Sequence, residues 1–207
     1  PDISADCPMA HMVSEEKIKK LREEYDDLAV VCYINSTADI KKLSDICVTS
    51  SNALNIVKKL PNKNIFFIPD ENLGRFVKEN IPEKNIILND GHCHIHAKID
   101  AKEVLLLKSL HPKAKVLAHP ECSEEVCKLA DFLGSTLEII NYAKEDSSDE
   151  YIILTECGVL YELKKNNPSK EFYFVKTTPV CSDMKLNTLD KILKVLQTEE
   201  NEILLNE

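Results

Sequence analysis

The sequence predicts an α/β fold in which repeated βα units build parallel sheets. Two observations predict it. Short apolar runs alternate with amphipathic helical stretches along nearly the whole chain, which is the pattern of βα units that build a parallel sheet. In addition, one order of strands, helices and cysteines occurs twice along the 207 residues.

The apolar runs locate the strands, and capping residues and prolines locate the helices and the joints between elements. The expected strands are Leu28–Ile34, Ile46–Val48, Asn64–Ile68, Asn85–Leu88, Lys115–Ala118, Tyr151–Leu154 and Glu171–Val175. Helices are expected to begin near Ser14, Thr37, Ser51, Glu71, Asp100, Ser123, Thr136, Gly158 and Thr188. Proline is a poor helix and strand residue, so joints are expected at Pro61, Pro69, Pro82, Pro112 and Pro168.

The two copies follow the same series: strand, helix, short strand, Ser/Thr turn, helix, strand, helix, strand and then a cysteine. Corresponding residues at a period of about 86 are Tyr33 and His119, Ser50 and Ser135, and Cys93 and Cys181. Counting back by the same period from Cys93 reaches Cys7. The period therefore predicts that Cys7 closes an earlier copy whose body is missing from this chain, and a sequence that begins at Pro1 rather than Met agrees with this expectation.

These three cysteines are candidate metal ligands. If the copies pack around a pseudo-threefold axis, the loops after their last strands converge near it, and ligands bind at such carboxyl ends. Three thiolates without a fourth protein ligand suit either zinc or a 4Fe-4S cluster with one open iron. An open iron would act as a Lewis acid that promotes the loss of water.

A zinc site is the alternative, because the segment Gly91–His96 contains Cys93 and three histidines. In an extended chain His92, His94 and His96 point to one side and Cys93 to the other. All four could therefore bind one ion only across a sharp turn.

The remaining cysteines are expected to be ordinary thiols of a protein in a reducing compartment, since no signal peptide or small disulfide scaffold is evident. Cys32 and Cys47 lie in apolar runs and are expected in the core. Cys122 and Cys127 are five residues apart, which fits neither a zinc knuckle nor one helix face, so they are expected to be ordinary thiols. Cys157 could be an ordinary thiol or a functional one.

Several polar residues follow strands or begin helices and are candidates for substrate contacts. His119 and Glu121 come directly after a strand and could transfer protons. Tyr33 and Asn35, at the corresponding strand end, could donate hydrogen bonds to carboxylates. Ser50, Ser135 and Thr136 lie at helix N-termini, where they could bind phosphate or carboxylate or could simply cap the helix.

Charge and hydropathy exclude other classes of function. Asp and Glu number 35 against 26 Lys and Arg, a net charge of −9, so we expect no nucleic-acid partner. No apolar run reaches the roughly 18 residues of a membrane helix, so we expect no membrane partner either.

Seven segments, in order and spacing, closely resemble the quinolinate synthase family: Asp6–Ala10, Tyr33–Thr37, Val48–Ala53, Gly91–His96, His119–Cys122, Gly134–Thr136 and Cys181–Lys185. The resemblance implies a cytoplasmic transferase of de novo NAD biosynthesis that condenses iminoaspartate with dihydroxyacetone phosphate to quinolinate, releasing phosphate and water. It also implies a functional link to an aspartate-oxidising enzyme.

The resemblance further implies a 4Fe-4S cluster bound by Cys7, Cys93 and Cys181. The implied substrate-binding residues are Tyr33, Asn35, Ser50, His96, His119, Glu121, Ser135 and Thr136, and the implied catalytic residues are Tyr33, His119 and Glu121. Relatives carry a further stretch before Asp6 that contacts substrate, and they extend past Glu207.

The resemblance implies repeated three-layer αβα sandwich domains, with parallel sheets, around a pseudo-threefold axis. The implied organisation has four parts: residues 1–23 as the remnant of a first αβα domain, residues 24–108 and 109–187 as the second and third domains, and residues 188–207 as a helix that returns to the first. Two alternatives to the synthase stay open from the residues alone: a zinc-dependent hydrolase that uses Gly91–His96, and a catalytically incomplete iron-sulfur binding or sensing fragment.

Overall fold

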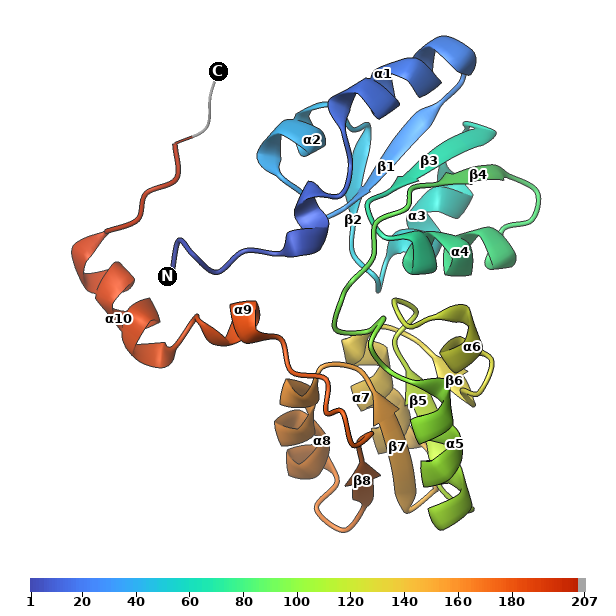
Figure 1. Cartoon of the computed structure of the whole chain (residues 1–207), viewed down its shortest axis with the longest axis vertical. Coiled ribbons are helices and arrows are strands. Elements are labelled where there is room, and N and C mark those ends of the chain that lie inside the picture. Colours follow the sequence, from blue (N-terminus) through green and yellow to red (C-terminus); the bar gives the residue numbers. More distant parts are fainter. Residues whose placement is uncertain (205–207) are drawn as a thin grey trace.

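The computed structural model describes residues 1–204. Two four-stranded parallel sheets form the upper and lower bodies of Figure 1, and helices cover both faces of each sheet. The prediction of an α/β fold with three-layer αβα units and parallel sheets is therefore confirmed. No helix in this described part of the chain is long and apolar enough to cross a membrane.

The first sheet has the strand order β2-β1-β3-β4, with β1 (Ala29–Tyr33), β2 (Ile46–Val48), β3 (Asn64–Ile68) and β4 (Asn85–Leu88). Its helices are α1 (Glu15–Glu24), α2 (Ala38–Lys42), α3 (Ala53–Lys59) and α4 (Glu71–Asn80). Successive strand residues face opposite sides of the sheet. Val30 packs with Ile18 of α1 on one face, whereas Val31 packs with Val57 of α3 on the other.

The second sheet repeats this order as β6-β5-β7-β8, with β5 (Lys115–Ala118), β6 (Phe132–Leu133), β7 (Glu150–Leu154) and β8 (Glu171–Tyr173). Its helices are α5 (Ala101–Leu110), α6 (Glu124–Cys127), α7 (Thr136–Glu145) and α8 (Leu160–Asn166). Val104 of α5 packs on the face that carries Val116, and Ile139 of α7 packs on the face that carries Leu117.

The helix before the first strand of each sheet belongs to that sheet. Ile18 of α1 lies in the core of the first sheet, and Val104 of α5 lies in the core of the second. The two helices begin 86 residues apart, at Glu15 and Ala101, which is the period of the repeat. This packing favours units that start at α1 and α5, whereas the expected boundaries at residues 23 and 108 separate these helices from their sheets. The division into domains stays a prediction.

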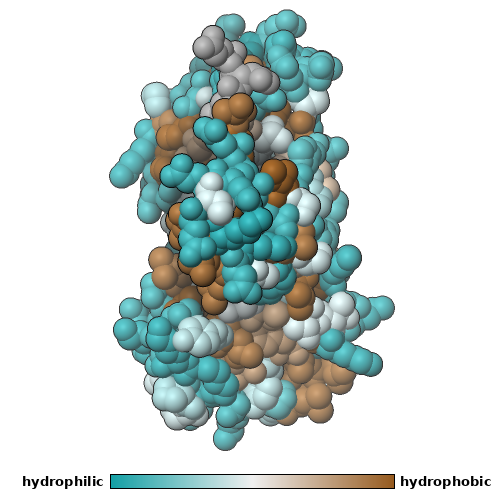
Figure 2. All heavy atoms as spheres, turned by 90° about the vertical axis from the view of Figure 1, so that its left-hand side faces the viewer, coloured by the Kyte–Doolittle hydropathy of each residue, from teal (hydrophilic) through white to brown (hydrophobic). Residues whose placement is uncertain are grey.

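Two short 3-10 helices and two further helices complete the described chain: η1 (Pro8–His11), η2 (Cys157–Val159), α9 (Ser182–Lys185) and α10 (Leu189–Thr198). Helix α10 has no buried residue. Figure 2, which looks onto the side of α9 and α10, shows hydrophobic residues in patches among hydrophilic ones. The predicted return of residues 188–207 to a first domain stays a prediction, and residues 205–207 lie outside the described residues.

Most strand and helix positions predicted from the sequence are confirmed within one or two residues. Strand β6 was not located from an apolar run, since only two of its residues pair, but the repeat predicts a short strand at this place and is confirmed. The expectation of a core position for Cys47 is wrong: its side chain is exposed, because β2 lies at the sheet edge, while Cys32 on the neighbouring central strand is buried.

Candidate functional site

A cavity of about 400 Å³ lies at the carboxyl ends of strands from both sheets. Parallel sheets commonly bind ligands at this edge, because loops from several strands meet there. All but one of the residues predicted for the site line this cavity: Cys7, Tyr33, Asn35, Ser50, Cys93, His96, His119, Glu121, Thr136 and Cys181. The exception is Ser135.

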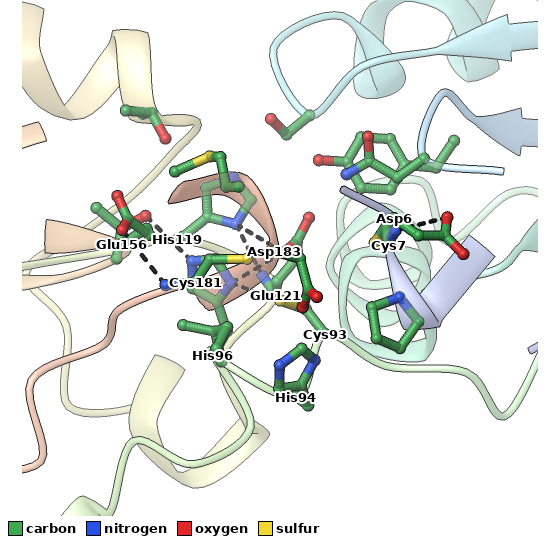
Figure 3. Close-up of a pocket in the computed structure, with 18 of the residues that line it drawn as sticks. Asp6, Cys7, Cys93, His94, His96, His119, Glu121, Glu156, Cys181 and Asp183 are labelled. Carbon is green, nitrogen blue, oxygen red and sulfur yellow. Dashed lines mark hydrogen bonds and ion pairs between the residues drawn. The ribbon is translucent and has the colours of Figure 1, made fainter. Parts of the chain in front are cut away.

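The three predicted ligand cysteines reach the cavity from three segments. Cys7 directly precedes η1, Cys93 follows β4, and Cys181 directly precedes α9. Figure 3 shows Asp6 and Cys7 on one side of the cavity and Glu156, His119 and Cys181 on the other, with Cys93 between them. All three thiols are free. Burial raises the pKa of the Cys7 thiol.

The segment after Cys93 turns instead of continuing in an extended form. The backbone N–H of Ala97 donates to the Cys93 carbonyl at 2.9 Å, which closes a turn over residues 93–97. The turn brings His96 Nδ1 to 3.2 Å from Cys93 Sγ. The alternation expected for an extended chain therefore does not apply here: His96 joins Cys93, while the His92 backbone N–H points to the sulfur of Met12.

His96 and Glu121 form a buried ion pair. His96 Nδ1 lies 2.9 Å from Glu121 Oε2, and His96 Nε2 lies 3.1 Å from the Thr155 hydroxyl. Burial by itself would lower the pKa of His96, but hydrogen bonds with Cys93 and Glu121 outweigh it and raise the pKa to about 10. Burial likewise opposes ionisation of Glu121, yet the His96 hydrogen bond lowers its pKa to about 2. The pair is thus an imidazolium and a carboxylate.

His119 lies beside this pair as a neutral ring. Its plane stacks on His96 with the ring centres 4.8 Å apart, and its side chain is only 5% exposed. Burial lowers the pKa of His119 to about 4. The backbone N–H of Glu121 donates to His119 Nδ1 at 3.2 Å, so the ring proton resides on Nε2. A neutral donor therefore lies next to a carboxylate on the wall formed by the second sheet.

Neutral polar groups form the opposite wall. Tyr33 ends β1, Asn35 follows it, and Ser50 lies after β2. Burial, followed by the charge of Glu121, raises the pKa of Tyr33, so its hydroxyl stays protonated and can donate. This wall can hydrogen-bond carboxylates or carbonyls without carrying charge.

Ser135 and Thr136 begin α7 but differ in position. Ser135 is the N-cap: its hydroxyl accepts from the Glu138 backbone N–H at 3.3 Å and donates to the Glu138 carboxylate at 2.6 Å. Thr136, the first residue of the helix, lines the cavity. The N-terminus of a ten-residue helix thus faces the cavity, a place that favours anions.

Several residues that line the cavity were not predicted from the sequence. Thr155 fixes the His96 ring, and Glu156 lines the cavity beside Cys181. Asp183, Met184 and Asn187 line it from α9 and its end. The repeat is the signal that could have indicated Glu156: Asp70 and Glu156 follow corresponding strands 86 residues apart, although each looks like an ordinary helix cap.

The chemistry of the donor set fits a 4Fe-4S cluster. Iron-sulfur clusters are held by cysteine thiolates. Three cysteines line the cavity, and within residues 1–204 no fourth does, so one iron would be left without a cysteine. A single metal ion would instead bind to Cys93, His96 and Glu121. Each of these residues offers one ligand atom, and the three atoms lie within 4.8 Å of one another.

Comparisons with known proteins agree on one family. The sequence model of the family described as "Quinolinate synthetase A protein" matches residues 1–207. The chain is similar to quinolinate synthases from Fusobacterium nucleatum, at 51% identity over 206 residues, and from Caldicellulosiruptor saccharolyticus, at 49% over 207 residues. A Clostridium novyi relative is 48% identical over 202 residues. The first two alignments cover the whole chain and 68% of each relative.

Proposed function

The chain belongs to the quinolinate synthase family of NAD biosynthesis, and from that premise we propose that it carries the site where iminoaspartate condenses with dihydroxyacetone phosphate to quinolinate. The reaction joins two carbon skeletons, closes a ring through the nitrogen, and releases phosphate and water. The observation that supports the proposal most is that three cysteines, from separate segments, line one cavity together with a buried acid and two buried histidines.

We assign proton transfer to the second-sheet wall. His119 is neutral and carries its proton on Nε2, so it can donate to a carbonyl or leaving hydroxyl oxygen. Glu121 is ionised and can accept a proton from a carbon or nitrogen of the substrate. His96, held on both ring nitrogens by Glu121 and Thr155, keeps that carboxylate in place.

We assign substrate orientation to the first-sheet wall and to the start of α7. The protonated Tyr33 hydroxyl, with Asn35 and Ser50, can donate hydrogen bonds to the carboxylates of iminoaspartate. Thr136 at the α7 N-terminus can bind the phosphate of the second substrate, because the free N–H groups there attract an anion. The resemblance also implies a substrate contact for Ser135.

We assign the cluster to Cys7, Cys93 and Cys181. When bound, a 4Fe-4S cluster with one iron free of cysteine supplies a Lewis acid that assists the loss of water. The chain's own contribution is to keep three thiols at one cavity and to surround them with polar groups of fixed charge state. Burial keeps Tyr33 and His119 neutral, whereas pairing keeps His96 and Glu121 charged.

Anaerobic purification with iron and sulfide quantitation tests the proposal. We expect a brown protein with broad absorbance near about 400 nm and quinolinate formation from both substrates. Cys93→Ala should lose iron, sulfide and turnover. Cys47→Ala, which alters an exposed thiol away from the cavity, should keep all three. A Cys93→Ala protein with a full complement of iron and sulfide would refute the ligand assignment.

A single zinc ion is the second candidate, because Cys93, His96 and Glu121 converge. It would support a zinc-dependent hydrolase. This alternative expects a colourless protein with stoichiometric zinc and activity that survives air. Metal analysis of the anaerobic preparation separates the two.

The substrates also indicate the setting of the reaction. Iminoaspartate is aspartate that has lost two electrons and two protons, so an aspartate-oxidising enzyme must supply it. We propose that both act in the cytoplasm.

A further inference from the structure

Each of the three cysteines at the cavity donates its backbone N–H to a carboxylate. Cys7 donates to Asp6 Oδ1 at 2.8 Å, Cys93 to Asp70 Oδ2 at 3.1 Å, and Cys181 to Glu156 Oε1 at 3.4 Å. Figure 3 shows the first and last of these bonds as dashed lines beside the labelled cysteines. None of the three carboxylates was among the predicted site residues, and only Asp6 lies in a segment that carries the family resemblance.

Asp70 and Glu156 occupy the same place in the two repeats. Each is the second residue after the third strand of its unit in chain order, β3 or β7, and they are 86 residues apart. Each uses one oxygen to cap the following helix: Asp70 Oδ1 accepts from Leu73 N–H and Glu156 Oε2 from Gly158 N–H, both at 2.7 Å. The other oxygen accepts the cysteine N–H. A carboxylate thus joins the start of a helix to the cysteine loop.

A second hydrogen bond also recurs in both repeats. The residue after the carboxylate donates its backbone N–H to the carbonyl two residues before the cysteine. Glu71 donates to the Gly91 carbonyl at 2.7 Å, and Cys157 donates to the Pro179 carbonyl at 2.8 Å. We call this pair of bonds, one to the carboxylate and one to the backbone, the cysteine clasp.

A helix cap alone does not account for the clasp. Asp100, the cap of α5, makes the same kind of bond to Lys102 N–H at 2.8 Å from an exposed position. Asp70 instead has no exposed surface. Burying a carboxylate is costly unless its oxygens are hydrogen-bonded, so the second oxygen of Asp70 needs the partner that Cys93 provides.

We propose that Asp70 and Glu156 are positioning residues that hold the backbone of Cys93 and Cys181 so that their thiols stay at the cavity. The inference rests on the proposed function only in taking these thiols as cluster ligands. Asp6 accepts the backbone N–H of Cys7 but does not join it to a distant helix, because Asp6 is the neighbouring residue and its other oxygen pairs with His11.

Crossed variants test the clasp. Asp70→Asn and Glu156→Gln each keep one carbonyl oxygen, which can still cap the helix. Each replaces the other oxygen with an NH2 group, which cannot accept a hydrogen bond from the cysteine N–H. In metal-free protein, treated with iodoacetamide and read by peptide mass spectrometry, Asp70→Asn should speed alkylation of Cys93 roughly tenfold. Glu156→Gln should do the same for Cys181. Each variant should leave the other cysteine, and the exposed reference Cys47, at the wild-type rate.

Asp100→Asn is the matched control, because it alters a cap that contacts no cysteine. It should change none of the alkylation rates. After anaerobic cluster loading, Asp70→Asn and Glu156→Gln should lose iron to a chelator faster than the wild type and Asp100→Asn do.

The outcomes separate this inference from the proposed function. Equal alkylation of Cys93 in Asp70→Asn and wild type, together with equal alkylation of Cys181 in Glu156→Gln and wild type, would overturn the clasp even if the protein holds a cluster. A protein that binds no iron would refute the cluster, while a selective rise in alkylation would still support the clasp. If the fully buried Asp70 variant does not fold, Glu156→Gln decides, since that side chain is 14% exposed.

Discussion

The two sheet units have the same strand order and the same cysteine clasp, but they present different chemistry at their carboxyl edges. The first unit offers neutral donors, Tyr33, Asn35 and Ser50, whereas the second offers the His96–Glu121 ion pair and the neutral ring of His119. His96 itself arrives on the linker between the units. The repeat therefore supplies a scaffold, and the residues after each strand supply the function.

The largest expected difference between the units concerns turnover. Glu121→Gln removes the buried carboxylate that we assign to proton transfer, and quinolinate formation should fall by roughly a hundred- to ten-thousandfold. Ser50→Ala on the opposite wall removes one neutral hydrogen bond and should cost only about tenfold. Anaerobic kinetics of both variants and the wild type measure the two losses of turnover. A loss in Ser50→Ala as large as that in Glu121→Gln would contradict the division of roles.

Two glycines beside the clasps, Gly91 before Cys93 and Gly158 after Glu156, should differ in their tolerance of a methyl group. A Cβ at Gly91 would lie 2.6 Å from the Pro69 carbonyl oxygen, a backbone atom that cannot move aside. Gly91→Ala should therefore lower the free energy of unfolding by about 1–3 kcal/mol. A Cβ at Gly158 would meet the ends of the Glu156 and Lys185 side chains, at 2.7 and 2.9 Å, which can rotate. Urea unfolding should show a smaller loss for Gly158→Ala.

His119 should make stability depend on pH. Its pKa is about 4 in the folded protein against about 6.5 in the unfolded chain. Above about pH 6.5 both states are neutral and the group contributes nothing. As the pH falls from 6.5 to 4, the unfolded chain binds a proton that the folded protein does not, so stability falls. Between pH 7 and pH 5 the expected loss is about 2 kcal/mol.

Urea unfolding at both pH values measures this loss, and His119→Gln provides the control because glutamine does not titrate. The variant should lose less stability than the wild type over the same interval. An equal loss in both proteins would show that other groups cause the pH dependence.

The sequence was sufficient to predict the scaffold because strands, caps and the repeat period are local or periodic signals. The runs around Val30 and Val116 predicted central strands, and the repeat period, with packing around a pseudo-threefold axis, predicted that Cys7, Cys93 and Cys181 converge. In the structure all three cysteines line one cavity. Whether they bind a cluster stays a prediction.

The contacts within the site could not be predicted, because they depend on three-dimensional packing. The turn after Cys93 reverses the side-chain alternation expected for an extended segment, and only this turn brings His96 to Glu121. No local pattern indicates that the caps Asp70 and Glu156 use their second oxygens on cysteines, since one bond suffices for a cap.

The smallest expected difference concerns the corresponding serines. Ser135→Ala removes the capping box of α7 and should lower the free energy of unfolding by about 1 kcal/mol. Ser50→Ala should change it by less than about 0.5 kcal/mol, because Ser50 does not cap α3. The Ser135 hydroxyl is already held by Glu138, so the KM for dihydroxyacetone phosphate should stay near that of the wild type. A clear rise in KM in Ser135→Ala, without a matching rise in Glu138→Ala, which loses the same box, would instead place the hydroxyl on the phosphate.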